Sequence, residues 1–335
     1  MKKLVAHIVP ALNIGGVEIA IHKSHKILNE EFDYRIFYVR KKGSIQCNQE
    51  PVWRLFYYLI CGNWRPDVVI TSLWWAHPFG WLTKLWGVSW VAFFHNSGYA
   101  HVLDKTLLRW AWRKADYHLA DSAATCTEMN IIIKQLALVV PYVFPLDKPI
   151  ASWDSREIDF LWCGRSSPVK RIDLLIKFLV LVESYFSGGR VIIAVAGEVP
   201  TDLADFAKTS RLNIEIKQNL HNTDVLSALS RAKFYLLFSD YEGMSMSTIE
   251  AVQSGCVAVI RRVGEIPSYL DESACVNIRD DSVEALKSVA LSVLTISNNP
   301  HSAESIRVAA LLSIRRLPHY SSSLLAALQT IIKQQ

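Results

Sequence analysis

Residues 234–260, FYLLFSDYEGMSMSTIEAVQSGCVAVI, decide the fold. They contain an apolar run at 234–239, a polar loop, a helical segment from Thr248 and a second apolar run at 257–260. Short apolar runs that alternate with helical segments are typical of βαβ units in a parallel sheet. This stretch therefore predicts a buried strand, a loop, a helix and a neighbouring buried strand.

The same alternation extends outward in both directions, on either side of a break at 141–149 that contains three prolines. A chain of 335 residues also exceeds the roughly 250–300 at which one hydrophobic core stops growing. We therefore expect two doubly wound α/β domains with parallel sheets. The expected segments are a first domain at 1–145, a linker at 146–157, a second domain at 158–315, and a C-terminal helix at 316–335 that could pack back on the first domain.

The long apolar stretch at 73–94 is the one candidate for a membrane span. Pro78, Gly80, Lys84 and Gly87 interrupt it, which favours a strand end, a short helix and a second strand. The N-terminal run, broken by His7 and Pro10, predicts a buried strand rather than a signal peptide.

Charge and tryptophan are unevenly distributed. Residues 1–150 hold 17 Lys+Arg against 11 Asp+Glu and nine of the eleven Trp, whereas residues 151–335 hold 19 against 20. Basic residues beside Trp and Tyr suit a surface that rests on anionic lipid headgroups, and equally a solvated basic face over core tryptophans. For most of the six residues Trp53, Trp74, Trp75, Trp81, Trp86 and Trp90 we expect a place in the core. No basic stripe or module predicts a nucleic-acid partner.

The six cysteines lack metal-ligand or disulfide-scaffold spacing, which favours a reducing cytoplasm and no zinc site. The sequence also lacks the glycine fingerprint of dinucleotide-binding proteins, the phosphate-binding loop of P-loop enzymes and an Asp-x-Asp pair for a nucleotide-bound metal. Dehydrogenase and P-loop chemistry are disfavoured accordingly.

Four loops that follow expected strands carry candidate functional residues, because ligands in such sheets bind beyond the carboxyl ends of the strands. The first is NIGGVE, where Gly15 and Gly16 let backbone approach an anion at a helix start. The same glycines, with Glu18 in the first turn, equally suit a tight strand-to-helix turn.

The second loop lies in LWCGRSSPVKRIDLL (161–175). The strand ends at Gly164, and Ser167 and Pro168 predict a helix cap and first helical residue beside Arg165 and Lys170. Two cations at the positive end of a helix favour a diphosphate site; the alternative is a cap with two solvated basic residues.

The third loop carries Glu242 and, eight residues on in the helix, Glu250. One carboxylate accepts two hydroxyl hydrogen bonds, so the pair could hold two polyols while the amides between them face phosphate. Acidic residues that stabilise a helix N-terminus are the alternative. The fourth loop is FFHNSG, whose His95 is by itself more often a packed than a catalytic histidine.

In this order the motifs resemble glycosyltransferase family 4, which are retaining enzymes of the GT-B fold. The resemblance rests on GGVE near the start, HN after a first-domain strand, GR with Lys170, EGMSMSTIEA as the E-x7-E signature, and GCVAVI and VGEIP. It implies two Rossmann-like domains that face each other across a cleft, of which the first, at 1–145, would bind the acceptor and the second, at 158–315, the nucleotide-sugar donor.

The resemblance also implies the role of each residue. Arg165 and Lys170, at Gly164, would bind the donor's diphosphate and stabilise the leaving group. Glu242 would hold sugar hydroxyls, and Glu250 the ribose hydroxyls. The remaining implied donor contacts are the amides of Gly243, Met244 and Ser245, Gly16 beside Gly15, and His95 near the reacting carbon. Two departures stand out: Arg171, where the family often has glycine, could add a third cation, and Ser245 replaces a second glycine.

The expected function is retaining, metal-independent transfer of a hexose from a nucleotide sugar, a UDP-sugar by preference, with no cofactor. The expected acceptor is a glycan or lipid-linked oligosaccharide of lipopolysaccharide, O-antigen or another surface polysaccharide, at the inner face of the cytoplasmic membrane. A noncatalytic GT-B protein that binds a glycan or a partner is the alternative, and an intact diphosphate clamp counts against it.

Overall fold

The computed structural model describes residues 2–11, 16–40, 49–95, 102–127, 137–146 and 149–335. The chain divides into two compact units. The first unit comprises Met1–Phe144 and Pro318–Gln335, and the second comprises Pro145–Leu317. The expected linker at 146–157 thus lies within the second unit.

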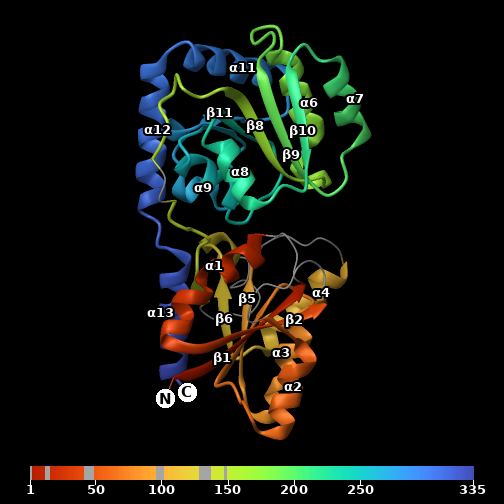
Figure 1. Ribbon diagram of the computed structural model, residues 1–335, viewed down its shortest axis with the longest axis vertical. Helices are drawn as coiled ribbons and strands as arrows, with labels where there is room; N and C mark the ends of the chain where they lie inside the picture. The colour runs from red at the N-terminus through yellow and green to blue at the C-terminus, as the bar shows by residue number, and fades with distance from the viewer. Residues whose placement is uncertain (1, 12–15, 41–48, 96–101, 128–136, 147–148) are drawn as a thin grey trace. The chain divides into compact units, whose positions relative to one another are not determined.

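The first unit is built on a parallel sheet whose described strands run in the order β3-β2-β1-β4-β5-β6-β7 (Figure 1). The strands are β1 (Lys3–Ala11), β2 (Phe32–Arg40), β3 (Gln49–Pro51), β4 (Val68–Ser72), β5 (Ser89–Phe94), β6 (Tyr117–Ala120) and β7 (Leu138–Val139). The helices are α1 (Gly16–Glu31), α2 (Val52–Cys61), α3 (His77–Thr83), the 3-10 turn η1 (Lys84–Trp86), α4 (Val102–Lys114) and α13 (Tyr320–Lys333).

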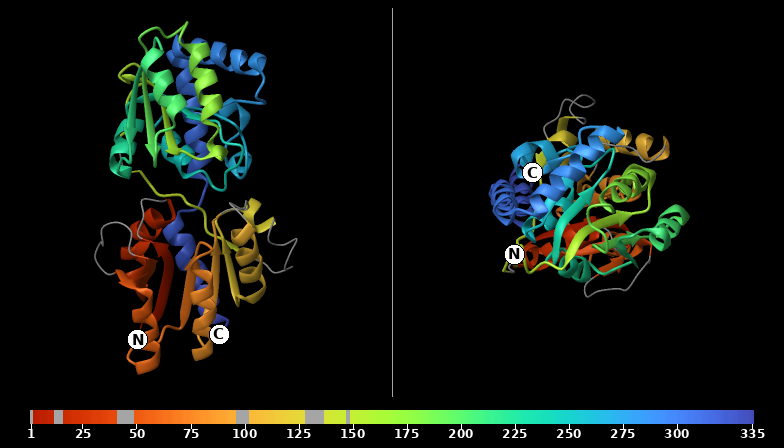
Figure 2. Two further views of the ribbon diagram at one scale, coloured as in Figure 1. Left: turned by 90° about the vertical axis from the view of Figure 1, so that its right-hand side faces the viewer. Right: turned by 90° about the horizontal axis from the view of Figure 1, so that it is seen from above.

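The strand order places these helices on two faces of the sheet. The chain crosses from β1 to β2 in one direction and from β3 to β4, β5 and β6 in the other. Because such crossovers are right-handed, α1 covers one face, and α2, α3 and α4 cover the opposite face (Figures 1 and 2). The C-terminal helix α13 packs against α1. Its first residue, Tyr320, donates its backbone N–H to the Val143 carbonyl at 2.9 Å and stacks on Tyr142 with ring centroids 5.0 Å apart.

The second unit repeats this architecture with described strands in the order β10-β9-β8-β11-β12-β13. The strands are β8 (Ile158–Arg165), β9 (Arg190–Ala196), β10 (Asn213–Gln218), β11 (Ala232–Leu237), β12 (Val257–Ile260) and β13 (Val276–Asn277). The helices are α6 (Ile172–Val182), α7 (Thr201–Thr209), α8 (Asn222–Leu229), α9 (Met246–Gln253), α10 (Ile266–Tyr269), α11 (Val283–Ser297) and α12 (Pro300–Arg315), with 3-10 turns η2 (Pro168–Lys170) and η3 (Glu272–Ala274).

The central strands are buried on both faces, as expected of a sheet with helices on either side. In β8 and β11 the residues Phe160, Trp162 and Phe234 belong to one core cluster with Phe178 of α6. The prediction of two doubly wound parallel sheets is confirmed. The stretch 73–94 contains α3, η1 and β5 as expected, and none of the helices in the described ranges is both long and apolar enough to cross a membrane.

Three details differ from expectation. Helix α2 (VWRLFYYLIC) was not predicted, although its buried residues Val52, Leu55 and Leu59 fall at helical spacing. A helix was expected over Thr223–Ala232, but α8 spans Asn222–Leu229 and Ala232 begins β11. Of the six tryptophans expected mostly in the core, only Trp90 is fully buried, while Trp53, Trp75 and Trp81 are exposed.

Candidate functional site

The loops after β8 and β11 lie side by side in the second unit, because the two strands are adjacent and parallel. A backbone hydrogen bond of 2.9 Å, from the Asp240 amide to the Val169 carbonyl, joins them. Gly164 is the last residue but one of β8, and a Cβ atom there would lie 3.3 Å from the Trp162 ring and 3.7 Å from Cδ of Lys170. The closer approach is to the Trp162 ring, and the lysine stem would be in ordinary contact.

Lys170 and Glu242 form the ion pair at the centre of this region. Nζ of Lys170 donates to Oε1 of Glu242 at 2.6 Å, and the two side chains are only 17% and 12% exposed. Arg165 stands nearby at the end of β8, exposed, and its guanidinium has no bonded partner among the described residues. The structure thus pairs Lys170 with Glu242 across the two motifs, and it places Arg165 at the strand end five residues before Lys170.

Glu250 projects from α9, which begins directly after the Glu242 loop. Its Oε1 accepts a 3.2 Å hydrogen bond from Nδ2 of Asn222, at the start of α8. Met244 and Ser245 are buried, and the Ser245 hydroxyl is 2.9 Å from that of Thr248. Because their side chains point into the protein, any ligand contact they make has to come from their backbone.

Two buried acids lie beneath the charged residues. Burial raises the pKa of the Cys163 thiol to about 12, with a further contribution from the Glu250 carboxylate. Burial, with smaller contributions from Cys163 and Glu242, raises the pKa of Tyr235 well above its usual value, and its hydroxyl donates to Ser247 Oγ at 2.7 Å. Both groups therefore stay neutral, and the carboxylates above them are the negative charges of the site.

The helix start after β8 differs from the prediction. Pro168–Lys170 forms a 3-10 turn, Ser167 makes no side-chain cap, and α6 begins only at Ile172. The interruption is Arg171, whose backbone is left-handed with φ 48° and ψ 55°. Lys170 consequently ends the 3-10 turn instead of lying in the first turn of an α-helix.

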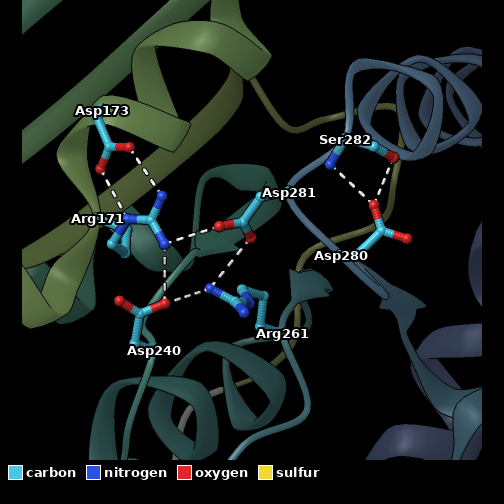
Figure 3. A network of polar contacts seen from close by, with 7 residues as sticks. All are labelled: Arg171, Asp173, Asp240, Arg261, Asp280, Asp281 and Ser282. Atoms are coloured by element: carbon cyan, nitrogen blue, oxygen red, sulfur yellow. Dashed lines mark hydrogen bonds and ion pairs between the residues drawn. The ribbon is translucent and has the colours of Figure 1, made fainter.

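The Arg171 side chain joins three segments of the second unit: its own, the loop after β11 and the loop after β13 (Figure 3). Its Nε and Nη2 donate to the two oxygens of Asp173 at 2.9 Å, and Nη1 donates to Asp240 at 2.9 Å and Asp281 at 2.8 Å. Arg261, after β12, pairs with the same Asp240 and Asp281. These contacts raise the pKa of Arg171, chiefly through Asp173. The arginine expected as a third free cation is thus engaged by three carboxylates.

We expect Arg171→Ala to be less stable than Arg171→Gly by about 1 kcal/mol, although both lose the same ion pairs. Glycine adopts the left-handed conformation freely, whereas a Cβ atom costs roughly 1–2 kcal/mol there. Urea unfolding of the two variants measures the difference. Equal stabilities would mean that the backbone at 171 relaxes once the side chain is removed.

Gly264 is a residue of this region to which the sequence motifs assigned no role. It follows β12 with φ +61°, and a Cβ atom there would lie 1.6 Å from the carbonyl oxygen of Glu242. Only glycine therefore lets the chain after β12 support the loop that carries Glu242. The sequence offered one indication of this role, because Gly264 lies in VGEIP after an expected strand. It did not show the contact with Glu242, which is 22 residues away.

Three predicted residues, Gly15, Gly16 and His95, belong to the first unit. Gly16 is the first residue of α1, and Gly15 lies outside the described residues. His95 follows β5; its Nδ1 shares a hydrogen bond with the Tyr142 hydroxyl, and its Nε2 is buried with no partner in the described ranges. Burial, with the neighbouring His7 and His77, lowers the pKa of His95 well below its usual value. His95 is therefore neutral, with one ring nitrogen unpaired.

Within the described residues no group of three or more His, Cys, Asp or Glu side chains could hold a metal ion. The expectation of metal-independent chemistry stays a prediction, because this observation does not test it.

Residues 144–306 match the family model described as Glycosyl transferases group 1. The match covers almost the whole second unit and none of the first beyond Phe144, and it confirms the resemblance expected from the motifs. No curated protein sequence matches the chain.

Solved structures of glycosyltransferases resemble the whole fold. A crystal structure of TarM matches with a TM-score of 0.79 at 13% identity and 99% coverage of both chains. HepE of Anabaena, in complex with UDP, matches with 0.73 at 13% identity and 99% coverage of both. A mutant of S. aureus TarM, in complex with fondaparinux, alpha-GlcNAc-glycerol and UDP, matches with 0.63 at 19% identity over 78% of this chain and 54% of that one. The GT-B fold is confirmed.

Proposed function

We propose that this protein is a retaining glycosyltransferase that transfers a hexose from a UDP-sugar to a glycan or lipid-linked oligosaccharide acceptor. The observation that carries the proposal is the Lys170–Glu242 ion pair, 2.6 Å long and mostly shielded from water, beside an Arg165 that no described residue pairs with. A noncatalytic binding protein has no need of such a paired cation and carboxylate. The UDP-bound neighbours of the same fold support the choice of donor class.

The ion pair suggests how a donor is bound. A diphosphate competes with Glu242 for Lys170 and also meets Arg165, while the released Glu242 carboxylate accepts hydrogen bonds from sugar hydroxyls. Glu250 accepts those of the ribose, and the backbone of Gly243–Ser245 contacts sugar or phosphate. The roles implied for Gly16 and His95 stay predictions.

Transfer itself follows from leaving-group stabilisation. The bond between the anomeric carbon and the diphosphate oxygen breaks, and the acceptor oxygen bonds to that carbon on the same face. The acceptor proton passes to the departing diphosphate. Lys170 and Arg165 stabilise the charge that develops there, and each such group is worth a few kcal/mol of barrier. No protein nucleophile and no metal enters this scheme.

We place the acceptor on lipopolysaccharide, O-antigen or another surface polysaccharide, assembled at the inner face of the cytoplasmic membrane. The unpaired state of all five described cysteines agrees with a reducing compartment. The basic, tryptophan-rich first unit agrees with work beside anionic lipid.

The test is thermal stabilisation by UDP-, GDP- and ADP-sugars in the presence of EDTA. A bound donor raises the melting temperature by mass action. At a donor concentration one hundred times the dissociation constant, the free energy of unfolding increases by about 2.7 kcal/mol. We expect a shift with UDP-sugars, lost in Glu250→Ala and kept in Glu284→Ala, which removes an exposed carboxylate in the first turn of α11. No shift with any sugar nucleotide would favour the noncatalytic alternative, and a shift that needs a divalent cation would overturn the metal-free scheme.

A further inference from the structure

Helix α2 of the first unit exposes large apolar and aromatic side chains on its outer side, where Arg54 is the one charged residue. Val52, Leu55 and Leu59 are buried. The outward positions one and two turns apart hold Trp53, Tyr57 and Ile60, which are 63%, 53% and 70% exposed. A helix that faces only water normally carries polar residues on that side. This side of α2 is therefore built to meet something less polar than water.

The apolar surface continues onto α3 and η1. Trp81 and Leu85 are 43% and 74% exposed. The two elements adjoin α2, because the ring of Phe56 lies 6.3 Å from that of Phe79 and 6.0 Å from that of Trp86. We call the combined surface the aromatic face; its members are Trp53, Tyr57, Ile60, Trp81 and Leu85.

Helix α4 adds positive charge beside the aromatic face. The ring of Trp110 in α4 lies 5.9 Å from that of Trp81. Lys105, Arg109 and Arg113 are spaced by four residues, so they share one side of α4, and all three are exposed. Together α2, α3, η1 and α4 contain six Lys or Arg and one acidic residue. The side chains flanking the aromatic face are thus almost all cationic.

This charge bias belongs to the first unit alone. Its residues, 1–144 and 318–335, contain 17 Lys+Arg and 10 Asp+Glu, whereas 145–317 contain 19 and 21. All the exposed tryptophans of the described residues also lie in the first unit. A second copy of a basic surface would repel the first, so charge complementarity points to an anionic occupant.

We propose that the aromatic face, flanked by the basic side of α4, docks on anionic membrane lipid. Tryptophan and tyrosine favour the headgroup level, Ile60 and Leu85 enter the acyl boundary, and Lys and Arg pair with lipid phosphates. The proposal rests on the proposed function in one respect: it brings the acceptor-binding unit to a lipid-linked substrate. It specifies the surface and the lipid class that the composition alone left open.

Binding to vesicles tests the proposal. The probes are phosphatidylcholine vesicles with and without phosphatidylglycerol, in a sedimentation assay at low salt. We expect wild type to prefer the anionic vesicles. We expect binding to weaken about tenfold or more in each of two double variants. Trp53→Ser/Ile60→Ser removes the aromatic and apolar contacts with the lipid. Arg109→Glu/Arg113→Glu removes two basic residues, each worth about a factor of five near a charged surface.

The matched control changes the same residue types on α1, which covers the opposite face of the sheet. Ile27 is 43% exposed and Lys26 is also exposed, and Ile27→Ser/Lys26→Glu should bind as wild type does. Loss in the control equal to that in the test variants would overturn the assignment of this face. Absence of vesicle binding, with a wild-type dimer that the Trp53 variant abolishes, would assign the face to a second copy instead.

Donor-induced stabilisation of the same variants separates this proposal from the proposed function. The aromatic face lies in the first unit, and the Lys170–Glu242 pair lies in the second. A variant that loses vesicles and keeps its UDP-sugar shift supports the docking surface. Vesicle binding without any donor shift would leave the surface standing and remove the glycosyltransferase proposal.

Discussion

Gly264→Ala is expected to lower transfer activity about a hundredfold and to destabilise the second unit by about 3 kcal/mol. The new Cβ atom would lie 1.6 Å from the Glu242 carbonyl oxygen and 2.7 Å from its carbon, so backbone has to move. Overpacking of this kind costs about 1–3 kcal/mol, and the left-handed conformation adds roughly 1–2. Displacing Glu242 by even 1 Å from Lys170 is enough for a loss of about a hundredfold.

Gly188→Ala is the matched control for this change. Gly188 also has a left-handed backbone, φ +75°, but a Cβ atom there would meet nothing within 4 Å. It should lose about 1 kcal/mol and keep full activity. Urea unfolding and initial rates with a UDP-sugar measure both variants. If Gly264→Ala behaved like Gly188→Ala, the loop at Glu242 would not depend on close packing against residue 264.

The second unit shows which parts of a site a sequence discloses. Lys170 and Glu242 were both found, because each lies in a local pattern of strand, loop and helix. Their ion pair was not foreseen, since 72 residues separate them and only the adjacency of β8 and β11 brings them together. Gly264 and Arg171 act through similarly distant partners. Local patterns identified the candidate residues, and the fold shows which distant residues position them.

The helices divide in the same way. A helix with one apolar side, such as α4 or α6, has a period that the sequence shows. Helix α2 has such a spacing too, at the buried Val52, Leu55 and Leu59. The large exposed side chains of Trp53, Tyr57 and Ile60 between them obscure it in the sequence, and the helix went unpredicted. Tryptophan alone could not distinguish core from surface: Trp90 and Trp53 look alike in the sequence, and only packing shows that the first is buried and the second exposed.

Acid should unfold the first unit before the second. His7 is buried between Tyr34 and Ser72, with hydrogen bonds of 2.5 and 2.7 Å, and burial lowers its pKa to about 3. His77 bonds to Thr71 at 2.8 Å, and its burial, with His118 nearby, lowers its pKa to about 3 as well. The two histidines of the second unit, His221 and His301, are both exposed.

The direction follows from proton binding. In the unfolded chain these histidines take up protons below the ordinary histidine pKa of 6.5, whereas in the folded unit they stay neutral down to about 3. The unfolded state then binds more protons, so the free energy of unfolding falls as the pH falls through this window. Each histidine contributes about 1.4 kcal/mol per pH unit, so from pH 6.5 to about 4.5 the pair costs about 5 kcal/mol. That is comparable with the whole stability of a small domain.

Urea unfolding between pH 7 and about 4.5, followed by tryptophan fluorescence, measures this loss, because nine of the eleven tryptophans lie in the first unit. The window stays above the range where Asp33, whose pKa is lowered from 3.8, would add its own effect. His7→Gln/His77→Gln should be less stable at pH 7 and should lose about half or more of the pH dependence, the remainder coming from His95 and His118, whose pKa values burial also lowers, while His301→Gln should follow wild type. If the free energy of unfolding of the double variant fell with pH as steeply as that of wild type, other groups would cause the acid sensitivity. His7 and His77 would then have to accept protons without unfolding the unit.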